Sequence, residues 1–217
     1  MSEGILVTVS GFSGSGKSTL MKELLKKYDQ YAFSISATTR QPRPGERDGI
    51  EYFFKTLEEF QQMIAKDAFM EYVRYADNYY GTPKFYVEDQ LANGKDVILE
   101  IEIECAIEVK QKCPDTLLLF VAPPSVGELE RRLLERGTET IESMQFRLAR
   151  AVEESKKMKG YDYIVINDVL EDCVEQIHRI ICSQRQLASK QIEFISQIQQ
   201  ELKRKIKDVT SVLQRID

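Results

Sequence analysis

A glycine-rich stretch near the start of the printed sequence has the residues and spacing of a phosphate-binding loop. GFSGSGKST, residues 11–19, fits the pattern G-x-x-x-x-G-K-[ST] between a predicted strand and a predicted helix. Its glycines let backbone N–H groups turn toward one anion, and Lys17 reaches the outer phosphates of a nucleotide. Ser18 offers a hydroxyl to the magnesium ion that accompanies those phosphates. The predicted nucleoside triphosphate site consists of Gly11, Phe12, Ser13, Gly14, Ser15, Gly16, Lys17, Ser18 and Thr19.

A second stretch, ISATTRQPRPGERDGIEYFF at residues 35–54, indicates a second phosphate site. Arg40 and Arg43 lie on a loop that two prolines stiffen, and guanidinium groups match the oxygens of a phosphate. With the hydroxyls of Tyr52 and Tyr80 they could surround a monoester phosphate. Taken alone, the stretch also fits an arginine-rich solvated loop. Beside the first site, it suggests that the chain binds both a phosphate donor and a phosphate acceptor.

Both stretches need a rigid scaffold, and the apolar pattern of the chain predicts a parallel sheet. ILVTVS, residues 5–10, is a β-branched run typical of a strand buried on both faces. Similar runs recur as DVILEIEI, TLLLFVA and DYIVIN, and segments with helical spacing separate them. Strands that alternate with helices imply right-handed crossovers and a parallel sheet. The predicted fold class is therefore α/β.

Two insertions and a tail interrupt this alternation. Residues 36–93 contain short aromatic runs broken by turn residues, which predicts a small, mostly β insertion. Residues 131–159 are rich in arginine and nearly all helical in pattern. From about Glu171 onward we predict one long helix, with apolar residues near a three-four repeat that Lys205 interrupts. This helix either packs on the body of the protein or pairs with a second copy as a homodimer.

Composition argues against several other classes of protein. The formal charge of −5 disfavours a general nucleic-acid coat, which needs clustered positive charge. The four cysteines form no CxxC pair and the chain has one histidine, so we expect neither zinc nor disulfides. No apolar run reaches the roughly eighteen residues of a membrane span, and the first residues lack the pattern of a signal peptide. We expect a cytoplasmic protein with reduced thiols.

Five motifs together resemble the guanylate kinase family, in order and over about residues 4–183. They are the phosphate-binding loop, TTRQPRPGERDGIEYFF, NYYGTP, RGTETIES followed by Arg147, and IVIND. The resemblance implies transfer of the γ-phosphoryl group of ATP to GMP, and to dGMP, with Mg²⁺ as cofactor. It also implies a three-layer P-loop fold with a small mixed-β GMP-binding insertion, a helical lid and a long C-terminal helix. The implied parts are a core of residues 1–35, 94–128 and 160–182, a GMP-binding region of residues 36–93, a lid of residues 129–159 and a C-terminal extension of residues 183–217.

The resemblance also assigns roles to residues outside the phosphate-binding loop. For GMP it implies Arg40, Arg43, Tyr52 and Tyr80 around the phosphate, and Ser36, Glu71, Thr82 and Glu102 around guanine. For ATP it implies Arg132 and Asn167, and for catalysis Lys17 with the lid arginines Arg136 and Arg147. Carboxylates suit guanine chemically, because guanine presents N1–H and N2–H₂ donors where adenine presents an acceptor at N1.

One segment departs from the family pattern. Where the family shows D-x-D-x-Q-G, this chain has EIEIEC at residues 100–105. Glu100 and Glu102 replace aspartates, Glu104 replaces glutamine and Cys105 replaces glycine. These changes are either conservative, because the charge is kept, or they alter the guanine contacts and the support of magnesium.

Two other functions remain alternatives to ATP:GMP phosphotransfer. A non-catalytic guanylate-kinase-like interaction module would lose phosphate-binding residues of the loop, but Gly16, Lys17 and Ser18 are present. A P-loop kinase for a different small acceptor would lack the arginine and tyrosine set of the second site, which is also present. We therefore expect ATP and GMP as the partners of the chain, without nucleic acid or membrane.

Overall fold

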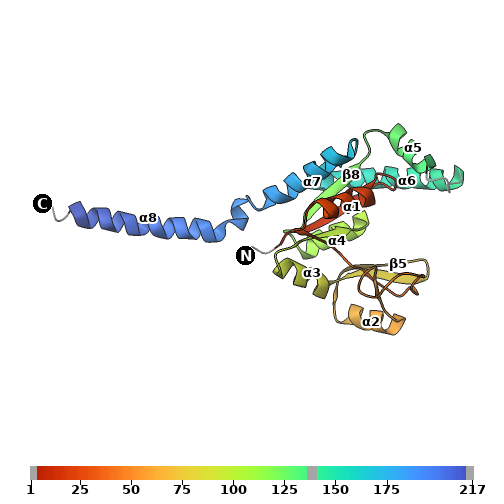
Figure 1. Cartoon of the computed structure of the whole chain (residues 1–217), viewed down its shortest axis with the longest axis horizontal. Coiled ribbons are helices and arrows are strands. Elements are labelled where there is room, and N and C mark those ends of the chain that lie inside the picture. The colour runs from red at the N-terminus through yellow and green to blue at the C-terminus, as the bar shows by residue number, and fades with distance from the viewer. Residues whose placement is uncertain (1–3, 136–140, 214–217) are drawn as a thin grey trace. The chain divides into compact units, whose positions relative to one another are not determined.

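We describe the protein from a computed structural model, which covers residues 4–135 and 141–213. The chain divides into two compact units, one within Met1–His178 and one within Arg179–Asp217. The first unit contains the phosphate-binding loop and both predicted insertions (Figure 1).

A parallel sheet forms the core of the first unit. In the described residues its five strands have the order β2-β7-β1-β8-β9, and each neighbouring pair is parallel. Their bounds are β1 Leu6–Gly11, β2 Tyr31–Phe33, β7 Asp96–Glu100, β8 Leu117–Ala122 and β9 Tyr163–Ile166. Val7, Val9 and Leu119 are fully buried, as expected for strands covered on both faces, and the predicted α/β fold is confirmed. The apolar pattern does not predict β2, because its three residues are too few to show a period.

Helices connect these strands. α1 spans Lys17–Lys27, α3 spans Lys84–Ala92, and α4 spans Ile103–Lys112 and packs on β1, β8 and β5. The run DVILEIEI predicts a strand through Ile103, and this prediction is wrong at its end. β7 stops at Glu100, since Ile103 begins α4 and is buried together with Ala106 and Val109 at helical spacing.

The insertion after β2 forms a second, mixed sheet with its own small core. In the described residues its four strands have the order β4-β3-β6-β5, with one parallel and two antiparallel pairs. Their bounds are β3 Ala37–Thr38, β4 Phe53–Phe54, β5 Phe69–Tyr75 and β6 Asn78–Pro83. The helix α2, Leu57–Ala65, begins at a capping box of Thr56 and Glu59 and packs Phe60 against Phe69, with ring centroids 4.4 Å apart.

The arginine-rich segment forms two helices that contact one another, α5 Val126–Glu135 and α6 Ile141–Lys157, followed by a short 3₁₀ turn, Met158–Gly160. Figure 1 shows α5 and α6 away from α2 and β5, with α1, β8 and α4 between them. The two insertions therefore lie on different sides of the core of the first unit.

The tail is not one continuous helix, so that prediction is wrong. α7 spans Leu170–Gln184, a 3₁₀ turn spans Ala188–Lys190, and α8 spans Ile192–Leu213. The apolar repeat lapses in RQLASKQ, residues 185–191, and Leu187 takes an extended conformation. The side-chain amide of Gln191 donates to the Arg185 carbonyl at 2.6 Å, which satisfies a group that a continuous helix would bond internally. Across the described residues we find no helix with both the length and the apolar character to cross a membrane.

Candidate active site

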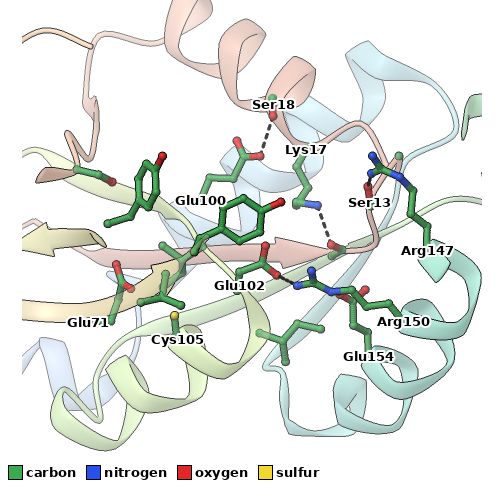
Figure 2. A pocket seen from close by; sticks show the side chains of 18 of the residues that line it. Ser13, Lys17, Ser18, Glu71, Glu100, Glu102, Cys105, Arg147, Arg150 and Glu154 are labelled. Carbon is green, nitrogen blue, oxygen red and sulfur yellow. Dashed lines mark hydrogen bonds and ion pairs between the residues drawn. The ribbon is translucent and has the colours of Figure 1, made fainter. Parts of the chain in front are cut away.

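One cavity of about 700 Å³ is lined by most of the predicted phosphate-binding loop and by some of the residues predicted for the acceptor. The phosphate-binding loop, the second sheet, the turn after β7 and α6, the helix of the predicted lid, all line it (Figure 2). The predicted residues in its lining are Gly11, Ser13, Gly14, Gly16, Lys17, Ser18, Thr19, Ser36, Glu71, Tyr80, Glu102 and Arg147. The predicted residues that are described but lie outside this lining are Phe12, Ser15, Arg40, Arg43, Tyr52, Thr82, Arg132 and Asn167. Arg136 lies outside the described residues.

The loop between β1 and α1 has the shape of an anion cradle. Gly16 precedes α1 in the left-handed conformation, with φ 88°, and a Cβ there would lie 2.4 Å from the Asn167 side-chain nitrogen. Only glycine fits both conditions without strain. The Lys17 ammonium donates to the carbonyls of Gly11 at 2.7 Å and Phe12 at 3.0 Å, so its charge lies over the loop. The loop and the helix N-terminus together favour a phosphate at this place.

Two of the predicted ATP-side residues brace this loop from behind. The side-chain amide of Asn167 donates to the Ser15 carbonyl at 2.8 Å, and Asn167 is buried. Arg132 donates to the same carbonyl at 3.3 Å and to the Asn167 carbonyl at 2.9 Å. In this structure Asn167 and Arg132 therefore contact the backbone of the loop and fix its shape, from outside the lining of the cavity.

Ser18 and Glu100 connect α1 to the end of β7. The Ser18 hydroxyl donates to the Glu100 carboxylate at 2.7 Å, and both side chains line the cavity (Figure 2). A hydroxyl and a carboxylate oxygen are hard ligands of the kind that Mg²⁺ prefers. The pair thus fits a magnesium ion bound mainly by phosphates.

A buried carboxylate faces the cavity from the second sheet. Glu71 on β5 is only 4% exposed and accepts a 2.7 Å hydrogen bond from the Thr82 hydroxyl, opposite it on β6. Burial raises the pKa of the Glu71 carboxyl above its ordinary value, while hydrogen bonds from Thr82 and Cys105 act in the opposite direction. Cys105 on α4 is also buried and lies beside Glu71 (Figure 2). Glu71 is therefore a fixed acceptor aimed at the cavity.

The predicted phosphate-binding set of the acceptor is partly assembled. Arg40 pairs with Glu46 at 2.9 Å, and its guanidinium lies 5.2 Å from the centre of the Tyr52 ring. The Tyr52 and Tyr80 rings are 6.2 Å apart, and Tyr80 reaches the cavity. Arg43 is exposed, and its backbone N–H donates to Glu46 at 2.7 Å. The structure thus groups Arg40, Tyr52 and Tyr80 at one edge of the cavity.

The lid helix α6 carries two arginines that reach across the cavity. Arg147 donates to the Ser13 hydroxyl on the phosphate-binding loop (Figure 2). Arg150 pairs with Glu102 and also donates to Glu154 at 2.8 Å. Arg150 and Glu154 are not among the residues predicted from the sequence. The available signal is spacing, because Arg150 follows Arg147 by three residues and Glu154 follows Arg150 by four, so they share a helix face.

Comparison with known proteins identifies this arrangement. The family model for guanylate kinase matches residues 4–184. The chain belongs to the guanylate kinase family. The resemblance inferred from the five motifs is confirmed, and the matched range includes every element that lines the cavity. The match of the family model ends before α8.

Individual guanylate kinases cover nearly all of the chain. The guanylate kinase of Desulfitobacterium hafniense (strain Y51) is 48% identical over 182 residues, which are 84% of this chain and 91% of that protein. The guanylate kinase of Caldanaerobacter subterraneus subsp. tengcongensis is 45% identical over 199 residues, 92% of this chain and 97% of that protein. The crystal structure of guanylate kinase from Anaplasma phagocytophilum matches with a TM-score of 0.67 and 27% identity, covering 88% of this chain and 90% of that one.

The segment that departs from the guanylate kinase pattern has partners on neighbouring helices. Glu100 accepts from Ser18 on α1, Glu102 from Arg150 on α6, and Glu104 from Lys157 on α6. The Lys157 ammonium lowers the pKa of the Glu104 carboxyl below its usual value. Each extra or lengthened carboxylate is therefore matched by a donor. Cys105, at the position of the family glycine, is buried against Glu71.

Proposed function

We propose that this member of the guanylate kinase family transfers the γ-phosphoryl group of ATP directly to the phosphate of GMP or dGMP. The family assignment makes the chain an enzyme, a nucleoside monophosphate kinase. The observation that carries the proposal is the cavity of about 700 Å³. It has a phosphate-binding loop on one side and, on the other, the buried carboxylate of Glu71, which can accept hydrogen bonds from guanine. Two substrates held in one cavity can react in line without a covalent intermediate on the protein.

On the donor side, the protein supplies positive charge and alignment. The backbone N–H groups of the loop hold the outer phosphates of ATP, and the Lys17 ammonium exchanges its carbonyl partners for phosphate oxygens. Arg147 already reaches the loop from α6, so it is placed to stabilise the charge of the migrating group. Phosphoryl transfer depends on such positioning more than on acid or base catalysis.

On the acceptor side, the polarity of the wall selects guanine. A deprotonated Glu71 accepts hydrogen bonds from guanine N1–H and N2–H₂, whereas adenine would place its N1 acceptor against the carboxylate. Thr82 and Cys105 donate to Glu71, which favours the deprotonated form that guanine needs. Arg40, Tyr52 and Tyr80 then hold the acceptor phosphate, and Arg43 joins them from the adjacent loop.

Magnesium would enter with ATP. Ser18 and Glu100 are the residues that would hold it, because their oxygens lie 2.7 Å apart at the edge of the loop. The described residues contain no group of three or more His, Cys, Asp or Glu that could hold a metal by themselves. In kinases Mg²⁺ is bound mostly by substrate phosphates and water, so this small protein contribution fits. When bound, the ion neutralises charge on the phosphates.

A coupled assay of ADP formation tests the proposed function, with GMP, dGMP, AMP, CMP and UMP offered in turn. We expect turnover with GMP and dGMP and much less with the other three. A preference for another nucleotide would instead favour a kinase with a different acceptor. Absence of ADP formation with all five, in a folded protein that binds GMP, would favour a non-catalytic interaction module.

We also propose that α8 pairs with a second copy of itself, in a protein located in the cytoplasm, where its four cysteines stay reduced. Ile198, Leu202 and Ile206 are exposed on α8 and continue a three-four repeat that passes beside Lys205. The first half of the helix carries Glu193 and Glu201, and the second half carries a run of basic residues, KRKIK at 203–207. An antiparallel pair would cover the apolar line and set acidic halves against basic halves.

Sedimentation of two single variants tests this pairing. Leu202→Glu places a charge on the apolar line and should convert a dimer to a monomer. Gln200→Glu adds the same charge on the opposite face and should leave the dimer intact. A parent protein that sediments as a monomer at micromolar concentration would reject the pairing.

A further inference from the structure

We propose that Arg150 is a positioning residue for acceptor recognition, which holds the Glu102 carboxylate from the lid helix α6. This inference rests on the proposed function and deepens it. It assigns a role to a residue that the family motifs do not include.

The geometry joins three charged side chains at the rim of the cavity. One nitrogen of the Arg150 guanidinium donates to Glu102, and its Nε donates to Glu154 Oε1 at 2.8 Å (Figure 2). Glu154 is only 9% exposed, so it is a fixed anchor for the arginine within α6. All three side chains line the cavity. Arg150 is therefore held at one end and holds Glu102 at the other.

Glu102 needs such a restraint. It lies at the N-terminus of α4 with an extended backbone, and its side chain caps none of the described N–H groups of that helix. The side chain is 57% exposed, and a glutamate has one more rotatable bond than the aspartate of the family pattern. A free glutamate would lose rotamer entropy on binding a base. The ion pair with Arg150 already restricts the Glu102 side chain before the base binds, so less rotamer entropy is lost on binding.

The pair leaves Glu102 able to bind guanine. A carboxylate has two oxygens and about four acceptor sites, and the contact with Arg150 uses Oε2. The other oxygen can accept an N–H of the base while the guanidinium keeps the group oriented. A charge-assisted bond from a planar fork is well suited to this task.

The same helix also reaches the donor side, because Arg147 contacts the phosphate-binding loop three residues earlier. α6 thus carries one arginine for each substrate. The two arginines should differ in their kinetic effects, since Arg147 acts on the transferring group and Arg150 on acceptor binding.

The test compares Arg150→Ala and Arg150→Lys with a matched variant, Lys157→Ala. Lys157 pairs α6 with Glu104, which lies outside the lining of the cavity, so its removal weakens the attachment of the helix without touching Glu102. We expect Arg150→Ala to raise the KM and the calorimetric Kd for GMP about three- to fivefold, the upper range for an exposed ion pair, with kcat and the KM for ATP within about twofold. Arg150→Lys should recover part of the affinity, and Lys157→Ala should leave GMP binding within about twofold of the parent.

A double-mutant cycle with Glu102→Gln decides between positioning and general support of the lid. If Arg150 acts through Glu102, Arg150→Ala should change GMP affinity less than about twofold in the Glu102→Gln background. Full additivity of the two changes, an equal loss in Lys157→Ala, or tighter GMP binding by Arg150→Ala would each overturn the inference. A parent enzyme without GMP kinase activity would contradict the proposed function instead, so the two failures are distinct.

Discussion

The two walls of the cavity are built in different ways. The wall that we propose binds the donor comes from one loop of nine residues, seven of which line the cavity; its backbone makes the cradle and its one lysine supplies the charge. The acceptor wall comes from side chains on β5, β6, the turn after β7 and the lid helix, which are far apart in the sequence. A backbone cradle fails as a whole when one element is lost, whereas a wall of side chains loses selectivity in steps. The predictions below test this difference.

The largest expected effect is on the donor wall. Lys17→Ala should lower kcat by a factor on the order of 10² to 10³, because a preorganised charge over the migrating phosphate is lost. Lys22→Ala, an exposed lysine on the same helix, is the matched control and should retain parent activity. Steady-state assays at saturating ATP and GMP measure the effect. Activity of Lys17→Ala within about threefold of the parent would contradict the assignment of the loop.

Changes to the carboxylates of the acceptor wall should lower the selectivity for GMP over AMP. Glu71→Gln keeps the shape of the side chain but replaces a double acceptor with a group that is half donor. The ratio of kcat/KM for GMP over AMP should fall roughly 5- to 150-fold, which corresponds to about 1–3 kcal/mol for a buried polar group left unpaired. Glu102→Gln should cause a smaller fall, because Glu102 is more exposed than Glu71. A larger effect at Glu102 would reverse the ranking of the two carboxylates.

A comparison of Gly16→Ala with Gly45→Ala separates the effect of backbone strain from the effect of a contact between the new Cβ and Asn167. Gly16 and Gly45 have φ of 88° and 91°, so an alanine costs about 1–2 kcal/mol of stability at either position. A Cβ at Gly16 meets Asn167, whereas a Cβ at Gly45 meets nothing within 4 Å. Both variants should lose a few degrees in Tm, and only Gly16→Ala should raise the KM for ATP, by about tenfold for a contact of ~1.4 kcal/mol. Equal ATP kinetics in the two variants would show that the contact is unimportant.

The smallest expected effect is on the pH dependence of kcat/KM for GMP, which reports on the acceptor wall. Burial raises the pKa of Glu71, and guanine needs the deprotonated form, so kcat/KM for GMP should fall as the pH drops through that raised pKa. Thr82→Val removes a donor to the carboxylate and should move this acid limb to higher pH. At a pH above this acid limb, Thr82→Val should lower kcat/KM for GMP by less than about fivefold, because one hydrogen bond contributes ~1 kcal/mol. Thr82→Ser keeps the hydroxyl, so its profile should match that of the parent; an unshifted Thr82→Val profile would exclude this contact.

The same difference explains what the sequence could predict. The loop is contiguous, so its pattern, the flanking strand and the following helix could be identified together. The parallel sheet was predictable for the same reason, because each long buried strand is a local apolar run. Family motifs led to Glu71, Tyr80 and Glu102, whose meeting in one cavity depends on the pairing of distant strands.

Other features had little or no local signal in the sequence. Arg150 contacts Glu102 across 48 positions of the sequence, so only the fold reveals the pair. The pairing of Arg40 with Glu46 depends on the turn that the loop adopts. The break between α7 and α8 contains neither glycine nor proline. The one sign of it in the sequence is that the apolar repeat is lost over the seven residues 185–191. The alternation in DVILEIEI looks like a strand, although its last residues begin a helix.

Cys105 has a consequence for the durability of the enzyme. Burial, helped by the nearby Glu71 carboxylate, raises the pKa of its thiol well above the ordinary value. Alkylating reagents and peroxides attack the thiolate, which this environment suppresses. Oxidants should therefore modify the partly exposed Cys113 and Cys182 first. A protein with a thiol inside its substrate cavity can in this way keep turning over under oxidative stress.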